Sequence, residues 1–159
     1  MTENALNKAY STLKGSLGQR IWQSDWFEVS QSLINDFANV TMDQQWIHVD
    51  PQRAKSGPFG TTIAHGQLTL AIMGHLPSPA DATTGTPKIE GQKARINYGF
   101  DKIRFPSPVP SGAKIRTTST LKRVEIKGNT IEQVTELVVD IEGHEKPACV
   151  AESVGRIVF

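Results

Sequence analysis

The stretch TIAHGQLTLAIMGHL, residues 62 to 76, contains no acidic residue, no lysine and no arginine. Its apolar residues fall all around a helical wheel instead of along one stripe. They are Ile63, Ala64, Leu68, Leu70, Ala71, Ile72 and Met73. Because a helix that is apolar on every side has to be covered on every side, we expect a buried helix from about Thr62 to Leu76 at the centre of the fold.

The chain after Lys88 follows a different period, in which apolar and polar residues alternate. The alternation is clearest from Ile131 to Ile141 and is repeated from Ala113 to Lys122, so both segments are expected to be half-buried strands. Residues 127 to 129, KGN, predict the hairpin turn between them, since Gly and Asn tolerate positive φ. A second turn is expected from Gly143 to Pro147, before a last strand from Ala148 to Phe159. Residues 106 to 112, PSPVPSG, are expected to form a loop because prolines interrupt a central ladder.

In the first half of the chain, a set of mainly apolar residues recurs at helical spacing. Ser30 precedes them, and serine is a residue type that favours the N-cap of a helix. The recurring residues are Leu33, Ile34, Phe37, Ala38 and Thr41. A helix from Ser30 to Met42 is therefore expected. Helices followed by long antiparallel strands are typical of the α+β class. The length of 159 residues fits one domain, residues 1–159.

Composition excludes several classes of protein. The 17 Lys and Arg balance the 16 Asp and Glu, so no excess of positive charge is present to bind nucleic acid. No apolar run reaches the roughly 20 residues that cross a bilayer, and no association with a membrane is expected. The N-terminal residues lack an apolar signal core, and the single Cys149 cannot form an internal disulfide. The cytoplasm is the expected location.

Unusual polar residues concentrate between Thr41 and Gly66. Asp43 follows the first predicted helix, and His48 lies five residues later in a segment broken by Asp-Pro and Gly-Pro. A carboxylate and an imidazole on one short loop can converge on a single water, and imidazole titrates in the range that suits proton transfer near neutral pH. The spacing alone also fits a turn aspartate and a structural histidine.

The dipeptide His65-Gly66 lies near the start of the predicted central helix. Unpaired N–H groups and the helix dipole favour negative charge at such a position, and a glycine lets a carbonyl oxygen approach its N–H closely. Gly66 is therefore a candidate oxyanion-binding residue. Close packing against the helix would explain the glycine equally well, and His65 would then be a core histidine.

Taken in order, these residues resemble a known family. Residues 43 to 54, DQQWIHVDPQRA, followed by residues 57 to 66, GPFGTTIAHG, are similar to the hydratase motif of MaoC-like dehydratases and (R)-specific enoyl-CoA hydratases. Residues 96 to 112, INYGFDKIRFPSPVPSG, resemble the strand and loop after the central helix in the nodulation-protein-N-like subgroup. The resemblance extends over nearly the whole chain.

The resemblance implies a hotdog fold, in which a long antiparallel sheet wraps around one central helix, and a homodimer with its site near the subunit interface. In the implied reaction, Asp43 and His48 hold a water that adds to C3 of a trans-2-enoyl-CoA, while a proton reaches C2 on the same face. The product is an (R)-3-hydroxyacyl thioester. The Gly66 N–H would bind the thioester oxygen. No cofactor is implied beyond the coenzyme A of the substrate, and an acyl-carrier-protein thioester is an alternative.

The chain departs from the family pattern at Gln45 and Trp46, where many members have Asn-Pro, and at Gly74, where many have Ser. Candidate substrate-binding residues follow the same motif. They are Gln45, Trp46, Phe59, Ile63, His65 and Leu68. For the coenzyme A phosphates, Lys102 and Arg104 are the candidates, although charges on a strand more often form its solvated face.

Three rival functions remain to be weighed. A hotdog thioesterase generally uses a carboxylate on or near the central helix, and residues 62 to 76 contain none. A zinc site from His48, Asp50 and His65 has suitable residue types, but Asp50 precedes a proline and is better explained as a turn cap, so no metal is expected. A non-catalytic acyl-thioester-binding protein is the third alternative, since a fold does not establish an activity.

Overall fold

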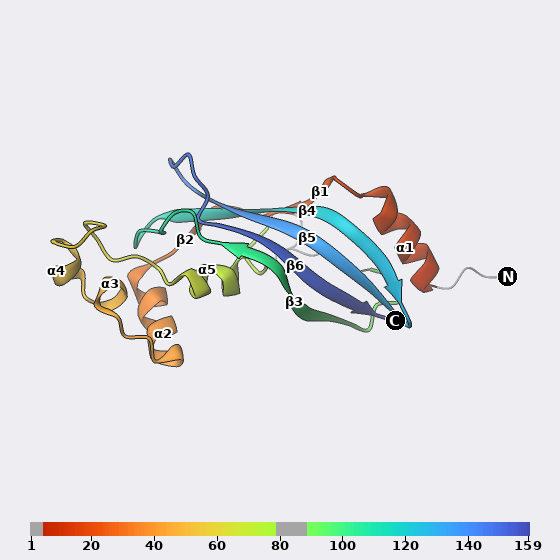
Figure 1. Cartoon of the computed structure of the whole chain (residues 1–159), viewed down its shortest axis with the longest axis horizontal. Helices are drawn as coiled ribbons and strands as arrows, with labels where there is room; N and C mark the ends of the chain where they lie inside the picture. Colours follow the sequence, from red (N-terminus) through yellow and green to blue (C-terminus); the bar gives the residue numbers. More distant parts are fainter. Residues whose placement is uncertain (1–4, 79–88) are drawn as a thin grey trace.

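The computed structural model describes residues 5–78 and 89–159. Its strands form one antiparallel sheet in the order β1–β4–β5–β6–β3, with β2 also paired to β4. The strands are β1 (Arg20–Gln23), β2 (Phe27–Glu28), β3 (Ala94–Arg104), β4 (Lys114–Lys127), β5 (Thr130–Ile141) and β6 (Cys149–Val158). The helices are α1 (Ala5–Gly15), α2 (Gln31–Thr41), α3 (Trp46–Val49), α4 (Pro51–Ala54) and α5 (Gly66–Ile72). The sheet curves, with α5 beneath one end and α1 at the other (Figure 1).

The strands predicted from the alternating pattern are confirmed. On β5 the apolar positions are buried as predicted, and β4 and β5 are joined at Gly128, which has a φ of 60°. The turn after β5 contains Gly143, with a φ of 76°, and the last strand, β6, ends one residue before Phe159. The predicted loop 106–112 connects β3 to β4. The sequence PSPADATTGTP, from Pro77 to Pro87, predicts a further loop, and most of this segment lies outside the described residues.

The first predicted helix is α2, with the cap that the sequence indicates. The Ser30 side chain accepts a hydrogen bond from the Leu33 N–H at 3.2 Å, which satisfies one of the free donors of the first turn. At the other end Met42 adopts a left-handed conformation, with a φ of 62°. This conformation turns the chain sharply just before Asp43.

The central helix is shorter than the predicted range of Thr62 to Leu76. Residues 62 to 64 are extended because their backbone groups pair with other segments: the Ala64 N–H donates to Val109 O, and the Ser111 N–H donates to Thr62 O. At the other end the helix gives way to a turn, in which the His75 N–H donates to Ile72 O. The expected complete cover is also wrong for the single chain, since Gln67 and Ala71 on one side of α5 are exposed.

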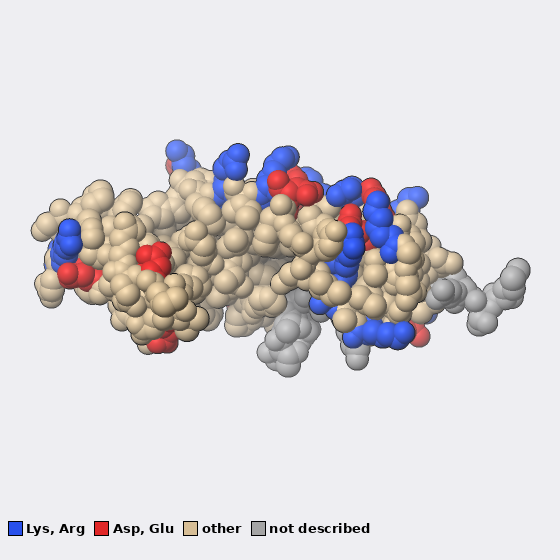
Figure 2. Space-filling model, turned by 60° about the horizontal axis from the view of Figure 1, so that its bottom comes forward, with Lys and Arg blue, Asp and Glu red and all other residues tan. Residues whose placement is uncertain are grey.

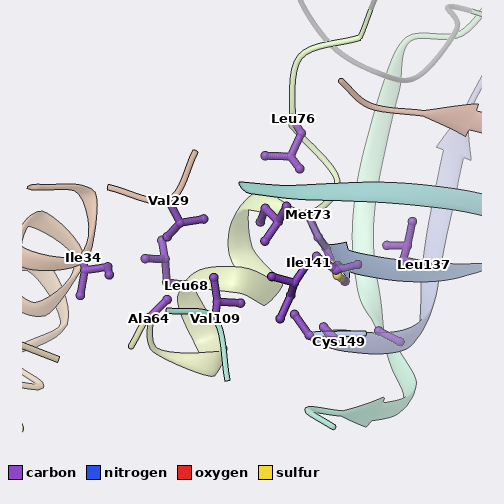
Figure 3. Packing of buried hydrophobic residues seen from close by; sticks show 14 of the residues in the cluster. Val29, Ile34, Ala64, Leu68, Met73, Leu76, Val109, Leu137, Ile141 and Cys149 are labelled. Carbon is purple, nitrogen blue, oxygen red and sulfur yellow. The ribbon is translucent and has the colours of Figure 1, made fainter. Parts of the chain in front are cut away.

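The hydrophobic interior of the described chain falls into two clusters. The larger one joins α5 and α2 to the sheet. Figure 3 shows Leu68 of α5 and Met73, the residue after this helix, in the same cluster as Ile141 of β5 and Cys149 of β6. The smaller one lies between α1 and the far part of the sheet, around Leu121 and Ile131. The two clusters place α5 and α1 on different parts of the same sheet.

Several elements of the N-terminal region were not predicted, namely α1, β1, β2 and the short helices α3 and α4. Their patterns are too short or too polar to stand out, because β2 has two residues and α3 and α4 have four each. No helix within residues 5–78 and 89–159 is long and apolar enough to cross a bilayer.

Candidate active site

The two candidate catalytic residues lie on the connection between α2 and α4. After the turn at Met42, Asp43 begins the connection, and its side chain is about half exposed. The short helix α3 then turns His48 inward, so that only 7% of this residue is exposed. One short segment therefore presents a solvated carboxylate and a buried imidazole.

The hydrogen bonds of His48 fix its tautomer. Its Nδ1 lies 2.7 Å from the backbone carbonyl of Ile63, and since a carbonyl only accepts, Nδ1 carries the proton. In the neutral ring, Nε2 then has the free lone pair. Burial lowers the pKa of His48 below its ordinary value, against an opposing effect from the Ile63 carbonyl, while the neighbouring His65 lowers it further and Asp43 raises it. The ring is therefore neutral near pH 7 and can accept a proton.

His65 lies directly against this pair and is 99% buried, with an exposed fraction of 1%. Its ring stacks on His48 with centroids 3.7 Å apart. Its Nε2 donates to the backbone carbonyl of Asp43 at 3.0 Å and lies 3.9 Å from the Asp43 carboxylate. His65, predicted to bind substrate, thus holds both candidate catalytic residues in place.

The three side chains converge. One carboxylate oxygen of Asp43 and one ring nitrogen each of His48 and His65 all lie within 4.8 Å of one another. Hydrogen bonds of about 2.8 Å from two such groups can meet on a single water molecule. The arrangement can position a water, remove a proton from it and hold the charge that results.

The same three residues are the set among the described residues that could hold a metal ion. The two rings are stacked, with centroids 3.7 Å apart, rather than pointed at a common centre. Asp50, the third ligand considered from the sequence, accepts from the Arg53 N–H as the cap of α4. The arrangement suits proton transfer better than tetrahedral coordination.

Gly66 is the first residue of α5, and His65 is its N-cap. The N–H groups of a first turn have no acceptor within their own helix. A Cβ atom at Gly66 would lie 3.3 Å from the ring of Phe105, so the glycine also allows close packing between α5 and the end of β3. The free N–H and the packing are both properties of this position, and the two interpretations of the sequence are compatible.

The other candidate substrate residues are spread around this centre. Gln45 is the N-cap of α3 and makes no capping bond with its side chain, whereas the Trp46 ring lies under Arg53 at 4.4 Å. Phe59 is 44% exposed. The side chain of Ile63 is buried, and its contribution to the site is the carbonyl that orients His48.

The two basic candidates on β3 differ. Lys102 pairs with Glu152 at 3.3 Å, which agrees with the interpretation of this residue as part of a solvated face. Arg104 is exposed and donates to the carbonyl of Ile103. It precedes Phe105, whose ring packs on Gly66, so its position is next to the start of α5.

Sequence reasoning missed Gln31, which connects the elements around the site. Its Nε2 donates to the backbone carbonyl of His48 at 2.7 Å, and its Oε1 accepts from the Thr62 hydroxyl. These partners lie 17 and 31 residues away, so no local pattern could have indicated them. Gln31 ties α2, α3 and the extended segment before α5 together.

Comparison with protein families identifies the family of this chain. The family described as the MaoC like domain matches residues 13–142. The chain belongs to this family, and the hotdog fold expected from the resemblance is confirmed.

Similar proteins include the 3-hydroxyacyl-thioester dehydratase Z of Mycobacterium tuberculosis (strain ATCC 25618 / H37Rv), which is 47% identical over 95% of this chain and 97% of its own length. The nodulation protein N of Rhizobium leguminosarum bv. viciae is 40% identical over 90% of this chain and 87% of its own length. Among solved structures, a MaoC-like dehydratase from Rhodospirillum rubrum superimposes with a TM-score of 0.71 at 21% identity, over 89% of this chain and 92% of that one.

Proposed function

We propose that the chain is an (R)-specific 2-enoyl-CoA hydratase that also catalyses the reverse reaction, as a 3-hydroxyacyl-thioester dehydratase. The observation that carries the proposal is the convergence of the Asp43 carboxylate and the His48 ring within 4.8 Å, beside the first turn of α5. The chain is a hydro-lyase, in agreement with the 47% identity to a 3-hydroxyacyl-thioester dehydratase over almost the whole length.

In the hydration direction, Asp43 and His48 hold one water molecule. The neutral His48 accepts a proton through Nε2 as the water oxygen bonds to C3 of the enoyl thioester. The Asp43–His48 pair then returns one proton to C2 on the same face, so that both groups end in their starting state. The lowered pKa of His48 keeps this base unprotonated near neutral pH. His65 holds the backbone of Asp43 and supports the His48 ring, which maintains the two groups at one distance.

The thioester oxygen gains negative charge while C2 is carbanion-like. The Gly66 N–H at the start of α5 is the donor that stabilises this oxygen, because a donor placed where charge develops lowers the barrier without reorganising. The reaction uses no cofactor beyond the coenzyme A or carrier-protein part of the substrate. Arg104, exposed at the same end of α5, is the candidate contact for its phosphates.

The proposal includes a homodimer formed through β3. This strand is an edge of the sheet, since its only partner among the described strands is β6. It exposes Ile96, Tyr98 and Phe100, and Figure 2 shows that the middle of the face seen there carries few charges. Edge strands with exposed apolar side chains are prone to pair with a second copy. The contact between Phe105 and Gly66 places the candidate site at one end of this edge.

The rival functions lack support from specific residues. A thioesterase generally uses a carboxylate on or near the central helix, and α5 contains no acidic residue. A binding protein would not need a neutral histidine whose tautomer is fixed beside a carboxylate.

We also propose the cytoplasm as the location of the enzyme.

The test is the loss of enoyl-thioester absorbance with crotonyl-CoA and a medium-chain 2-enoyl-CoA, together with the chirality of the product. Formation of the (R)-3-hydroxyacyl-CoA supports the proposal. Release of free thiol would indicate a thioesterase, and tight acyl-CoA binding without turnover would indicate a binding protein.

A further inference from the structure

His48 lies on α3, a helix of only four residues. A helix this short closes a single turn, and its internal hydrogen bonds are too few to hold it in place. α3 lies beside α2 at the end of the molecule away from α1 (Figure 1). The position of the His48 ring therefore depends on bonds from α3 to other segments.

Two of these bonds join α3 to the extended segment before α5. The Ile63 N–H donates to Ile47 O at 3.0 Å, and His48 Nδ1 donates to Ile63 O at 2.7 Å. The second bond sets the tautomer of His48, because the ring nitrogen that has an acceptor keeps the proton and the other keeps its lone pair. The distance between α3 and residues 62–63 thus determines whether Nε2 can act as a base.

The side chain of Gln31 bonds to both of these segments. Its Nε2 donates to the His48 carbonyl at 2.7 Å, and its Oε1 accepts from the hydroxyl of Thr62, the residue before Ile63. The same Nε2 also donates to Asn35 Oδ1 at 2.8 Å. If the amide turned over, its oxygen would face the carbonyl oxygen of His48, and two acceptors cannot bond. The Gln31 amide is therefore held in one orientation.

Both ends of this connection are anchored. Gln31 is the first residue of α2, directly after the Ser30 cap, and Ile34 in the following turn is fully buried. Thr62 is 1% exposed, and its carbonyl accepts from the Ser111 N–H. The short helix α3 is thus attached, through Gln31, to two segments that other contacts already fix.

We propose that Gln31 is a positioning residue for His48: its amide holds α3 and residues 62–63 at the distance that keeps the Nδ1 proton on Ile63 O and the Nε2 lone pair available to the water. The kinetic part of the inference rests on the proposed hydratase function. A displacement of about 1 Å in a reacting group can cost roughly 10²-fold in rate. A weaker bond to Ile63 also lets the proton move to Nε2, where the ring can then no longer accept one.

The kinetic experiment measures kcat and KM for crotonyl-CoA in Gln31→Met and Thr62→Val. Methionine has nearly the length of glutamine and valine nearly the shape of threonine, but neither replaces the lost hydrogen bonds. We expect Gln31→Met to lower kcat by about 10- to 100-fold, and Thr62→Val, which removes one bond, to lower it less. KM should change little in either variant, because Gln31 acts through His48.

The double variant tests whether the two residues act through one another. If they do, Gln31→Met combined with Thr62→Val is no worse than Gln31→Met alone. Losses that multiply would contradict the proposed connection.

Asn35→Ala is the matched control. Asn35 is exposed, and its bond to Gln31 lies within α2, so the variant removes one bond of the amide and leaves those to His48 and Thr62. It should retain the kcat of the wild type. An equal loss in Asn35→Ala would show that Gln31 acts by stabilising the first turns of α2, and would overturn the inference.

The ¹⁵N chemical shifts of the His48 ring give a readout independent of turnover, because they distinguish a protonated ring nitrogen from an unprotonated one. They are assigned on the full chain by comparison with His48→Phe. At pH 7.5 the wild type and Asn35→Ala should carry the proton on Nδ1, and Gln31→Met should show a mixture of tautomers. Thr62→Val provides the same test if circular dichroism shows that Gln31→Met does not fold.

The wild-type tautomer in both Gln31→Met and Thr62→Val would overturn the inference even if kcat falls, since a general loss of stability does not move this proton. A wild type that fails to hydrate crotonyl-CoA would refute the proposed function instead. The tautomer of His48 in the variants would still decide the role of Gln31.

Discussion

The imidazole rings of His48 and His65 stack with centroids 3.7 Å apart and an angle of 25° between their planes. Each ring also bonds to a backbone carbonyl, His48 to that of Ile63 and His65 to that of Asp43. Two stacked imidazoles are hard to protonate together because like charges repel at this distance. The stack therefore helps to keep His48 neutral, and the hydrogen bond from His65 holds the backbone of Asp43 beside it.

The substitution His65→Phe tests this relationship. A phenyl ring keeps the stacking surface but removes the bond to Asp43 and the repulsion that lowers the pKa of His48. A base works only when deprotonated, so activity falls as pH drops through its pKa. We expect the acid limb of the kcat/KM profile to move to higher pH in the variant, with a lower plateau. An unchanged acid limb, measured from pH 5 to 8, would contradict the role given to His65.

The protonation of His48 also links stability to pH. Burial lowers its pKa in the folded chain, so the unfolded chain binds a proton more readily between the folded pKa and the ordinary value near 6.5. The stability that the neutral His48 contributes is therefore fully present above about pH 6.5, and it is lost as the pH falls through the pKa of His48 in the folded chain. Thermal unfolding of His48→Phe should depend less on pH between 7.5 and 5 than that of the wild type. The control His144→Phe, at an exposed turn, should behave as wild type.

The close contact between Gly66 and Phe105 predicts a specific rescue. An added methyl group at position 66 would lie 3.3 Å from the ring of Phe105, which is 44% exposed and can shift by a few tenths of an ångström, so Gly66→Ala should destabilise the chain by at most about 1 kcal/mol. Phe105→Leu should restore part of this loss in the double variant because the smaller side chain makes room. Chemical denaturation of the four proteins measures the coupling. Strictly additive effects would show that the two residues do not compete for this space.

The proposed dimer predicts that the same substitution has different effects on oligomeric state at two exposed apolar residues of the sheet. Tyr98→Glu places a charge on the free edge of β3, whereas Ile126→Glu places one near the turn after β4. We expect Tyr98→Glu to shift the protein to a monomer in light scattering and to lose activity with it. Ile126→Glu should remain dimeric and active. A wild-type monomer with full activity would contradict the dimer.

How much the sequence predicted depended on the range of the interactions. The alternation in β4 and β5 and the Ser30 cap of α2 are local patterns, and both were predicted correctly. The start of α5 was placed four residues too early because Ile63 and Ala64 pair with Ile47 and Val109, partners that no local pattern reveals. The apolar character of residues 62 to 76 reports burial, and burial does not by itself distinguish a helix from an extended segment.

The candidate site shows the same limit. Asp43 and His48 could be selected because their order matches a family motif, and the structure places them together. The positions of Gln31 and His65 around them depend on contacts between segments far apart in the chain.

The most direct test of the account is crotonyl-CoA hydration by Asp43→Asn, His48→Ala and the variant that combines them. If both residues act on one water, each single variant loses about 10²- to 10⁴-fold in kcat/KM, and the double variant is scarcely worse than the poorer single one. The control His144→Ala retains full activity. Near-wild-type hydration by either single variant, with the fold intact by circular dichroism, would contradict the assignment of the catalytic pair.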